Sequence, residues 1–306
     1  MKKIFISLLA VAALAACNKS EVVDVNPGEA IQFGNAFVDN ATKADYSSTD
    51  ISAFNVYGTV NNVNIYNATP VTKTAAYGAA WTCGVTQYWI EGAAYKFAAL
   101  VDVPADNVTP DEYGMPASFT YAADVQTDIL YDYAVATGKP AGQNSVVAFT
   151  FKHLLAKAYF TVTNLTNDTK YTYTVSEVKV TNTYPNGTYT VYTTDEGTGS
   201  WGSYGTATST AFATIEDVAY GTPKTNAELL LIPGAQVGVS FTVTLSIDGK
   251  VVTSFDHSVE NVATLAQNSV YNFNVTLSPN DPIQFTVTEQ PEWNTPVSDN
   301  TVTVSK

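Results

Sequence analysis

Apolar and polar residues alternate strictly along the segment Phe241 to Ile247. The apolar members would share one face of an extended strand and the threonines and serine the other, because successive strand side chains point to opposite sides. This period of two predicts an antiparallel sheet with one buried and one solvated face. Apart from residues 260–267, where a helix is an alternative, no stretch longer than about two turns has helical periodicity. The predicted class is all-β.

Segments of the same character recur along the chain, separated by loops with Gly, Pro, Asn or Asp at the spacing of a β-sandwich. In residues 171–182 the alternation slips between Val175 and Val178, which predicts a β-bulge at Ser176-Glu177. We expect strands at residues 30–38, 52–60, 85–90, 94–101, 117–123, 129–136, 145–151, 154–164, 171–182, 187–193, 227–232, 239–247, 250–258 and 269–277.

Composition limits the class and the partners. Charged residues form 14% of the chain, while Thr, Val, Asn and Tyr are abundant, a balance that favours half-buried strands. The 14 basic residues are all lysines and face 28 acids, for a net charge of -14. Such a charge repels phosphate backbones, so nucleic acid is excluded as a partner. Residues 138–144 have the composition of a linker, so we expect one domain over 44–143 and a second over 144–306.

The chain begins like an exported lipoprotein. Lys2 and Lys3 precede an apolar run that is shorter than the roughly 20 residues of a membrane span, which is typical of a secretory signal. Leu14-Ala15-Ala16-Cys17 resembles a lipobox, so residues 1–16 are the predicted signal peptide and Cys17 the lipidated first residue, held in the outer membrane. Residues 17–43 would then be a tether and first strand. Cys83 has no partner in the mature chain, so packing must stabilise the fold.

Catalytic motifs are missing from the sequence. His153 and His257 are the only histidines and lie far apart, and a packed structural role is expected for both. The sequence has neither a glycine-rich phosphate loop nor a Gly-x-Ser-x-Gly elbow. Acids on polar strand faces and loops, Asp128 and Asp132 among them, leave a glycosidase pair as a remaining alternative, because such pairs have no fixed spacing. We predict no enzyme, no metal and no cofactor.

Several segments, taken together and in this order, resemble the fimbrillins, the subunits of type V pili. The resemblance spans nearly the whole chain and implies two tandem transthyretin-like (Ig-like) β-sandwich domains with a structural role in adhesion at the cell surface. The segment Phe151–Lys157 (FKHLLAK) is the most distinctive. The matching segments are the lipobox and residues 30–37, 42–45, 87–100, 127–136, 146–164, 230–234, 269–277 and 283–293.

The resemblance also implies a mechanism. Fimbrillins reach the surface as lipoproteins, lose the lipid and first strand to a trypsin-like protease, and polymerise by strand exchange, so other pilin subunits and a processing protease are the expected partners. Here the cut would fall between Lys43 and Ala44. The family's cut usually follows arginine, which leaves the identity of the protease open. The removed strand would take Ile31, Phe33 and Phe37 out of the core.

Two C-terminal segments are candidates for the donated strand. One carries Ile283, Phe285 and Val287, and its Ile-Gln-Phe repeats that of the first strand; the other carries Val302 and Val304. We expect Phe285→Asp or Val302→Asp to block polymer growth and leave the monomer folded. A stalk subunit fits a chain with a donor tail, whereas a tip subunit would lack the tail and an anchor would lack an accessible cleavage loop. The alternative functions are a tip adhesin and a surface lipoprotein that binds glycans through a Tyr and Trp platform.

Overall fold

The structure is a computed structural model that describes residues 28–38, 51–73, 80–167, 170–194, 199–278, 283–290, 293 and 301–304, with the backbone alone at 35–38 and 301–304. Strands dominate this part of the chain, with two short 3-10 helices, η1 (Ala105–Asn107) and η2 (Ala123–Val125). The prediction of an all-β chain is confirmed. Among these residues no helix has the length and apolar character to cross a membrane.

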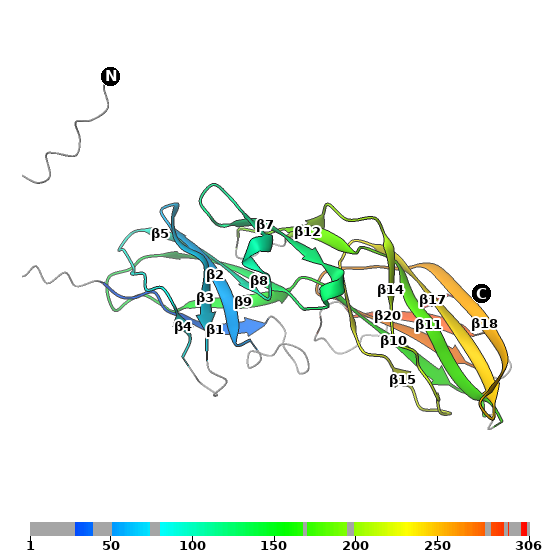
Figure 1. Cartoon of the computed structure of the whole chain (residues 1–306). Helices are drawn as coiled ribbons and strands as arrows, with labels where there is room; N and C mark the ends of the chain where they lie inside the picture. Colours follow the sequence, from blue (N-terminus) through cyan, green and yellow to red (C-terminus); the bar gives the residue numbers. More distant parts are fainter. Residues whose placement is uncertain are drawn as a thin grey trace, which may run out of the picture.

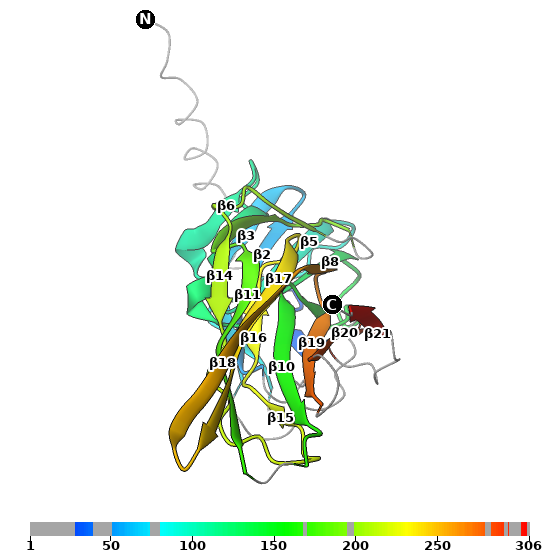
Figure 2. The same ribbon diagram turned by 90° about the vertical axis from the view of Figure 1, so that its right-hand side faces the viewer.

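Two sandwiches lie in tandem and give the molecule an elongated shape (Figures 1 and 2). A seven-stranded and a four-stranded sheet build the N-terminal sandwich. The order in the first is β1 (Phe33–Val38), β9 (Val147–His153), β8 (Leu130–Thr137), β5 (Ala94–Val101), β2 (Ala53–Val60), β3 (Val63–Thr72) and β4 (Thr82–Cys83). The order in the second is β13 (Ser200–Gly202), β12 (Asn186–Thr190), β7 (Pro116–Ala122) and β6 (Val108–Pro110).

The C-terminal sandwich packs a six-stranded sheet against a four-stranded one. The six strands are β15 (Lys224–Thr225), β10 (Ala156–Asn164), β19 (Val270–Leu277), β20 (Gln284–Gln290) and β21 (Thr301–Val304), with β16 (Leu229–Leu231) paired to β10. The four strands are β14 (Thr208–Ala211), β11 (Thr172–Thr183), β17 (Gln236–Ile247) and β18 (Lys250–Thr264). Phe160 of one sheet and Phe241 of the other have ring centroids 5.5 Å apart, which places the core between the sheets.

The seven-stranded sheet is buried on both faces. Along β5, Phe97 and Ala99 belong to one hydrophobic core, whereas Ala98 and Leu100 belong to another core shared with β7 and β12. A strand buried on both faces needs apolar residues at nearly every position, which explains the almost continuous apolar run of residues 97–101. The second core continues into the C-terminal half, because it includes Leu230 and Ile232.

The sheets do not divide at the predicted boundary between residues 143 and 144. Strand β9 follows that boundary, yet it pairs with β1 and β8 of the N-terminal sheet. Strand β12, further along, pairs with β7. Residues 138–144 connect β8 to β9, so their Gly, Pro and Asn residues mark a loop within a sheet. Composition reveals a turn but not which strands the turn joins, and the first crossover between the sandwiches falls at Leu154-Leu155.

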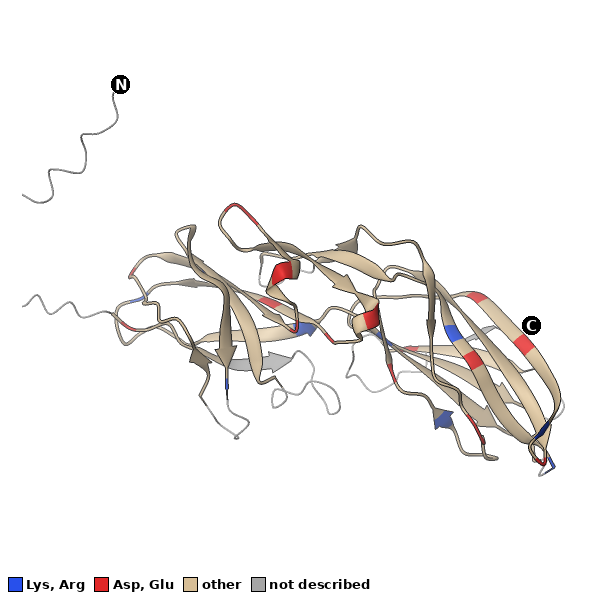
Figure 3. Ribbon diagram, in the orientation of Figure 1, with Lys and Arg blue, Asp and Glu red and all other residues tan. Residues whose placement is uncertain are grey.

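Local expectations have mixed outcomes. The bulge in β11 is confirmed by a register shift between Ser176 and Lys179, with Glu177 at φ 52°. Residues 85–90 are not a strand; Tyr88 forms an isolated bridge to Ala30. Residues 260–264 continue β18, so the helical alternative there is wrong. Figure 3 shows the charged residues scattered along both sandwiches.

Candidate functional site

The first described segment, Glu29 to Val38, is hydrogen-bonded on both sides. On one side the N–H of Ile31 donates to the carbonyl of Gln87 (2.8 Å) and the N–H of Trp89 donates to the carbonyl of Glu29 (2.9 Å). On the other side β1 runs parallel to β9, and the N–H of Val147 donates to the carbonyl of Gln32 (2.8 Å). The segment therefore closes the sheet by joining two parts of the chain that lie far from each other in sequence.

Phe33 occupies the centre of the core that this segment closes. Its side chain is 5% exposed. Its ring lies 5.4 Å from the ring of Tyr66, 5.9 Å from Phe97, 6.2 Å from Phe149 and 6.4 Å from Phe54, measured between centroids. These partners come from four different strands, β3, β5, β9 and β2. Ile31 is buried in the same core, so both residues hold the curled sheet together.

The predicted third member of this strand, Phe37, lies opposite Thr150 in the backbone register; its side chain is outside the described residues. The register is irregular between Gly34 and Phe37. A Cβ atom at Gly34 would lie 2.8 Å from Cγ1 of Val146, so glycine lets the segment approach the start of β9 closely.

Glu29 ties the segment to the loop between β8 and β9. Its Oε2 accepts hydrogen bonds from the side-chain amide of Asn144 (2.8 Å) and from the N–H of Gly142 (2.9 Å). These bonds, that of Asn144 first, lower the pKa of the Glu29 carboxyl. A cavity of about 340 Å³ opens beside this loop, and Trp89 and Phe97 contribute to its lining. The predicted linker is therefore part of the seat of the first segment.

The two candidate donor segments are adjacent strands of one sheet. Strand β20 pairs with β19 on one side and β21 on the other. Phe285 and Val287 are buried in the C-terminal core, Ile283 packs against it, and the ring of Phe285 lies 6.4 Å from that of Phe273. Strand β20 is thus an integral part of its own sandwich. Because Phe285 is buried, we now expect Phe285→Asp to destabilise the monomer, since a carboxylate there would lose its hydration without a partner.

Strand β21 is the outermost strand of that sheet. Its backbone pairs Val302 with Val287 and Val304 with Phe285. The side chains of Val302 and Val304 lie outside the described residues. Cys17, Lys43 and Ala44 also lie outside them, together with the predicted signal peptide.

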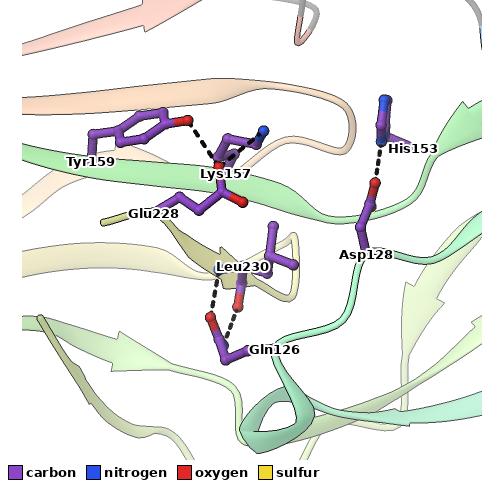
Figure 4. A network of polar contacts seen from close by, with 7 residues as sticks. All are labelled: Gln126, Asp128, His153, Lys157, Tyr159, Glu228 and Leu230. Carbon is purple, nitrogen blue, oxygen red and sulfur yellow. Dashed lines mark hydrogen bonds and ion pairs between the residues drawn. The ribbon is translucent and has the colours of Figure 1, made fainter. Parts of the chain in front are cut away.

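A partly buried polar cluster at the junction of the sandwiches was missed by the sequence reasoning. Nδ1 of His153 lies 2.7 Å from Oδ2 of Asp128, and Nζ of Lys157 lies 3.2 Å from Oε2 of Glu228 (Figure 4). The hydroxyl of Tyr159 donates to the same Glu228 oxygen (2.9 Å). Burial raises the pKa of the Asp128 carboxyl, and the contacts with His153 and Lys157 oppose that rise. The sequence signal was a set of polar residues within the apolar run Phe151–Lys157.

Neither of the two acids considered for catalysis is on a polar surface. Asp128 is buried, and so is Asp132, whose Oδ2 accepts the N–H of Thr150 at 2.6 Å. Burial raises the pKa of Asp132 to about 6. The structural interpretation of His153 is confirmed, since it is packed and hydrogen-bonded. Within the described chain, no group of three or more His, Cys, Asp or Glu residues could hold a metal ion.

The tryptophans do not form a surface platform. All four lie among the described residues, where Trp89 and Trp293 are buried and Trp81 and Trp201 are half-buried. The indole N–H of Trp201 donates to the carbonyl of Leu154 (2.8 Å). These side chains serve the cores and the junction, so the platform of the glycan-binding alternative loses its tryptophans.

The pattern of the family described as fimbrillin-like matches residues 35–291. Residues 1–18 match a prokaryotic membrane lipoprotein lipid attachment site. No curated protein matches the sequence.

Solved structures share the fold at low sequence identity. A fimbrial protein from Bacteroides vulgatus has a TM-score of 0.58 and 13% identity, covering 86% of this chain and 99% of its own. A candidate cell adhesion protein from Parabacteroides distasonis has a TM-score of 0.53 and 13% identity, covering 87% and 97%. Another from Bacteroides uniformis has a TM-score of 0.51 and 20% identity, covering 86% and 97%.

Proposed function

Since the chain belongs to the fimbrillin-like family, we propose that it is a pilus subunit that polymerises after a protease removes its first strand and another copy supplies a replacement. The family match and the lipid attachment site identify it as an exported lipoprotein of the cell surface. The role we propose is structural and supports adhesion.

The contacts that hold the first segment in the sheet are the observation that carries this proposal. Ile31 and Phe33 are buried in a hydrophobic core of the N-terminal sandwich. The segment hydrogen-bonds to residues 87–89 on one side and to β9 on the other. At roughly 1.5 to 3 kcal/mol per buried side chain, loss of both would remove about 3 to 6 kcal/mol of burial before entropy is subtracted. The groove left behind would expose apolar rings and unpaired backbone groups, which a strand from another copy can satisfy.

Lys43 is the proposed cleavage site. It follows β1 by five positions, and a cut before Ala44 would leave the first segment held by noncovalent contacts alone. The chain has no arginine, so a protease that requires arginine could not perform this step. An enzyme that accepts lysine is therefore the processing partner in this proposal.

Of the two candidate donors, we favour β21. Strand β20 has partners on both sides and contributes Phe285 and Val287 to its own core, so donating it would dismantle the donor. Strand β21 has one partner strand, and its removal leaves β20 paired with β19. The presence of such an edge strand after the last core strand supports a stalk position over a tip position.

The test uses residues 18–306 without lipid. Brief treatment with a lysine-cutting protease should give Ala44 as the new N-terminus, followed by a ladder of polymers that resist mild SDS. A Lys43→Gln variant is the matched control; it should not give Ala44 as a new N-terminus and should stay monomeric. Early cleavage at another position, or a chain trimmed at Lys43 that stays monomeric, would contradict the proposal and favour a tip adhesin.

A further inference from the structure

Two buried basic side chains lie at the first crossover between the sandwiches. His153 ends β9 and Lys157 is the second residue of β10, and they are 1% and 2% exposed. Figure 4 shows their acidic partners coming from other parts of the chain, Asp128 from the segment before β8 and Glu228 from the segment before β16. Buried charges need such partners, because taking them out of water is unfavourable.

A tryptophan from the C-terminal region contacts both basic side chains. The ring of Trp293 stacks on that of His153, with centroids 3.9 Å apart and an angle of 17° between the planes. Nζ of Lys157 lies 4.1 Å from the centroid of the Trp293 ring, a distance at which a cation is attracted to an aromatic face. Trp293 is 8% exposed and lies three positions after the end of β20.

Contacts of the ring, rather than a side-chain hydrogen bond, hold Trp293 in place. Its Nε1 is buried and has no hydrogen-bond partner within the described chain. The ring belongs to the hydrophobic core at the junction, so apolar packing acts together with the stacking on His153 and the contact with Lys157. The residues that bind the ring are also ones that water would solvate well. Removing the ring would expose His153 and Lys157, which would keep their acidic partners Asp128 and Glu228.

Trp293 separates a fixed part of the chain from a part that is held weakly. Before it, Phe285 and Val287 are in the core of the C-terminal sandwich. After it, β21 pairs with a single strand over four residue pairs. The sequence has thirteen residues after Trp293, which exceeds the ten residues of the first segment, Glu29 to Val38.

We infer that Trp293 is a clamp that fixes the base of the C-terminal tail to the junction of the sandwiches, so that only the residues after it are released for donation to another copy. The role in donation rests on the proposed function, whereas the clamp is a property of the single chain. Trp293, His153 and Lys157 are thus positioning residues for the exchanged strand.

The clamp is tested first in the uncleaved chain, residues 18–306. Trp293→Ala removes the ring, Trp293→Phe keeps an aromatic face, and Lys157→Met keeps the length of the lysine stem without its charge. Diethyl pyrocarbonate labels histidines that reach water, with His257 as the internal reference. Hydrogen exchange compares the peptide that contains β21 with the peptide that contains β19, which reports on the core.

In Trp293→Ala, diethyl pyrocarbonate should label His153, and the amides of β21 should exchange at least tenfold faster than in the parent chain. The amides of β19 should exchange at the parent rate. Trp293→Phe should restore most of the protection, and Lys157→Met should accelerate β21 alone by several-fold. Unchanged β21 exchange in Trp293→Ala would overturn the inference. If Trp293→Ala unfolds the chain, the test rests on Lys157→Met. Equal acceleration of amide exchange in β19 and β21 of that variant would show that Trp293 is an ordinary core residue and would overturn the inference.

The polymer assay then separates the clamp from the proposed function. After cleavage at Lys43, Trp293→Ala should form polymers several-fold faster than the parent chain, because its tail is released more readily. A parent chain that never polymerises would refute the proposed function, while faster labelling and exchange in the variants would still establish the clamp. Polymers that form at the parent rate in a variant with an accelerated tail would overturn the role of the clamp in donation.

Discussion

Substituting Phe33 by alanine in the uncleaved chain is the sharpest test of the first strand's seat. Truncating a buried phenylalanine to alanine costs about 3 to 5 kcal/mol, and the upper half applies where the walls cannot collapse into the cavity. The ring of Phe33 contacts rings from four strands, so no single strand can move in to fill the space. We therefore expect a loss of about 4 kcal/mol, a large fraction of the 5 to 15 kcal/mol typical of a domain.

The assay is urea unfolding of residues 18–306, with the first transition assigned to the N-terminal sandwich. Phe255→Ala is the matched control, because Phe255 is 52% exposed on β18 and its truncation should stay within about 0.5 kcal/mol. After cleavage at Lys43, the Phe33 variant should also release the first segment faster. A loss of stability below about 1 kcal/mol in Phe33→Ala would refute the reasoning, since the ring would then not be seated in the core.

Three further predictions concern packing and pH. Gly138→Ala should lose about 1 to 3 kcal/mol in urea, because its Cβ would lie 2.0 Å from the carbonyl oxygen of Ile90, whereas Gly84→Ala has open space and should be neutral. Phe285→Asp should leave the chain insoluble or without a cooperative transition in circular dichroism. Burial raises the pKa of Asp132 from 3.8 to about 6, so the fold favours the neutral acid. The contribution of neutral Asp132 to stability is complete below pH about 4 and is lost as the pH rises through 6. Between pH 4 and pH 8, the free energy of unfolding of Asp132→Asn should therefore rise by about 3 kcal/mol relative to that of the parent. An equal dependence of the unfolding free energy on pH in the two chains would contradict this.

The sequence predicted the parts of the fold that depend on local patterns. Alternation of apolar and polar residues identified the strands of the C-terminal sandwich, and the phase slip at Ser176-Glu177 located a bulge that the structure contains. Burial on both faces was harder to recognise, because the apolar run of β5 has no alternation to read. The membership of β9 and β12 in N-terminal sheets could not be predicted, because pairing between distant segments leaves no trace in composition.

The candidate site was predicted only in part, because contacts between distant segments cannot be recognised from local patterns. The pattern of Ile31 and Phe33 correctly placed both residues on a buried face, but the bonds from the segment to residues 87–89 required the tertiary fold. The echo of Ile-Gln-Phe at residues 283–285 suggested a donor, yet Phe285 belongs to its own core. Trp293 was part of a family resemblance without a role, and its contacts with His153 and Lys157 join residues more than 130 positions apart.

The difference between the two exchangeable strands gives the proposed reaction its direction. Before donation, strand β21 pairs with one neighbouring strand, β20, over four residue pairs. The emptied groove offers pairing with β9 on one side, bonds to residues 87–89 on the other, and the space of two buried side chains. Both β1 and β21 pair with one neighbouring strand over four residue pairs, so the gain on transfer comes from the added bonds to residues 87–89 and from the burial of two apolar side chains. In the uncleaved chain the groove is already filled, so the same tail gains nothing by leaving. Cleavage, rather than subunit concentration, is thus the step that should start polymer growth.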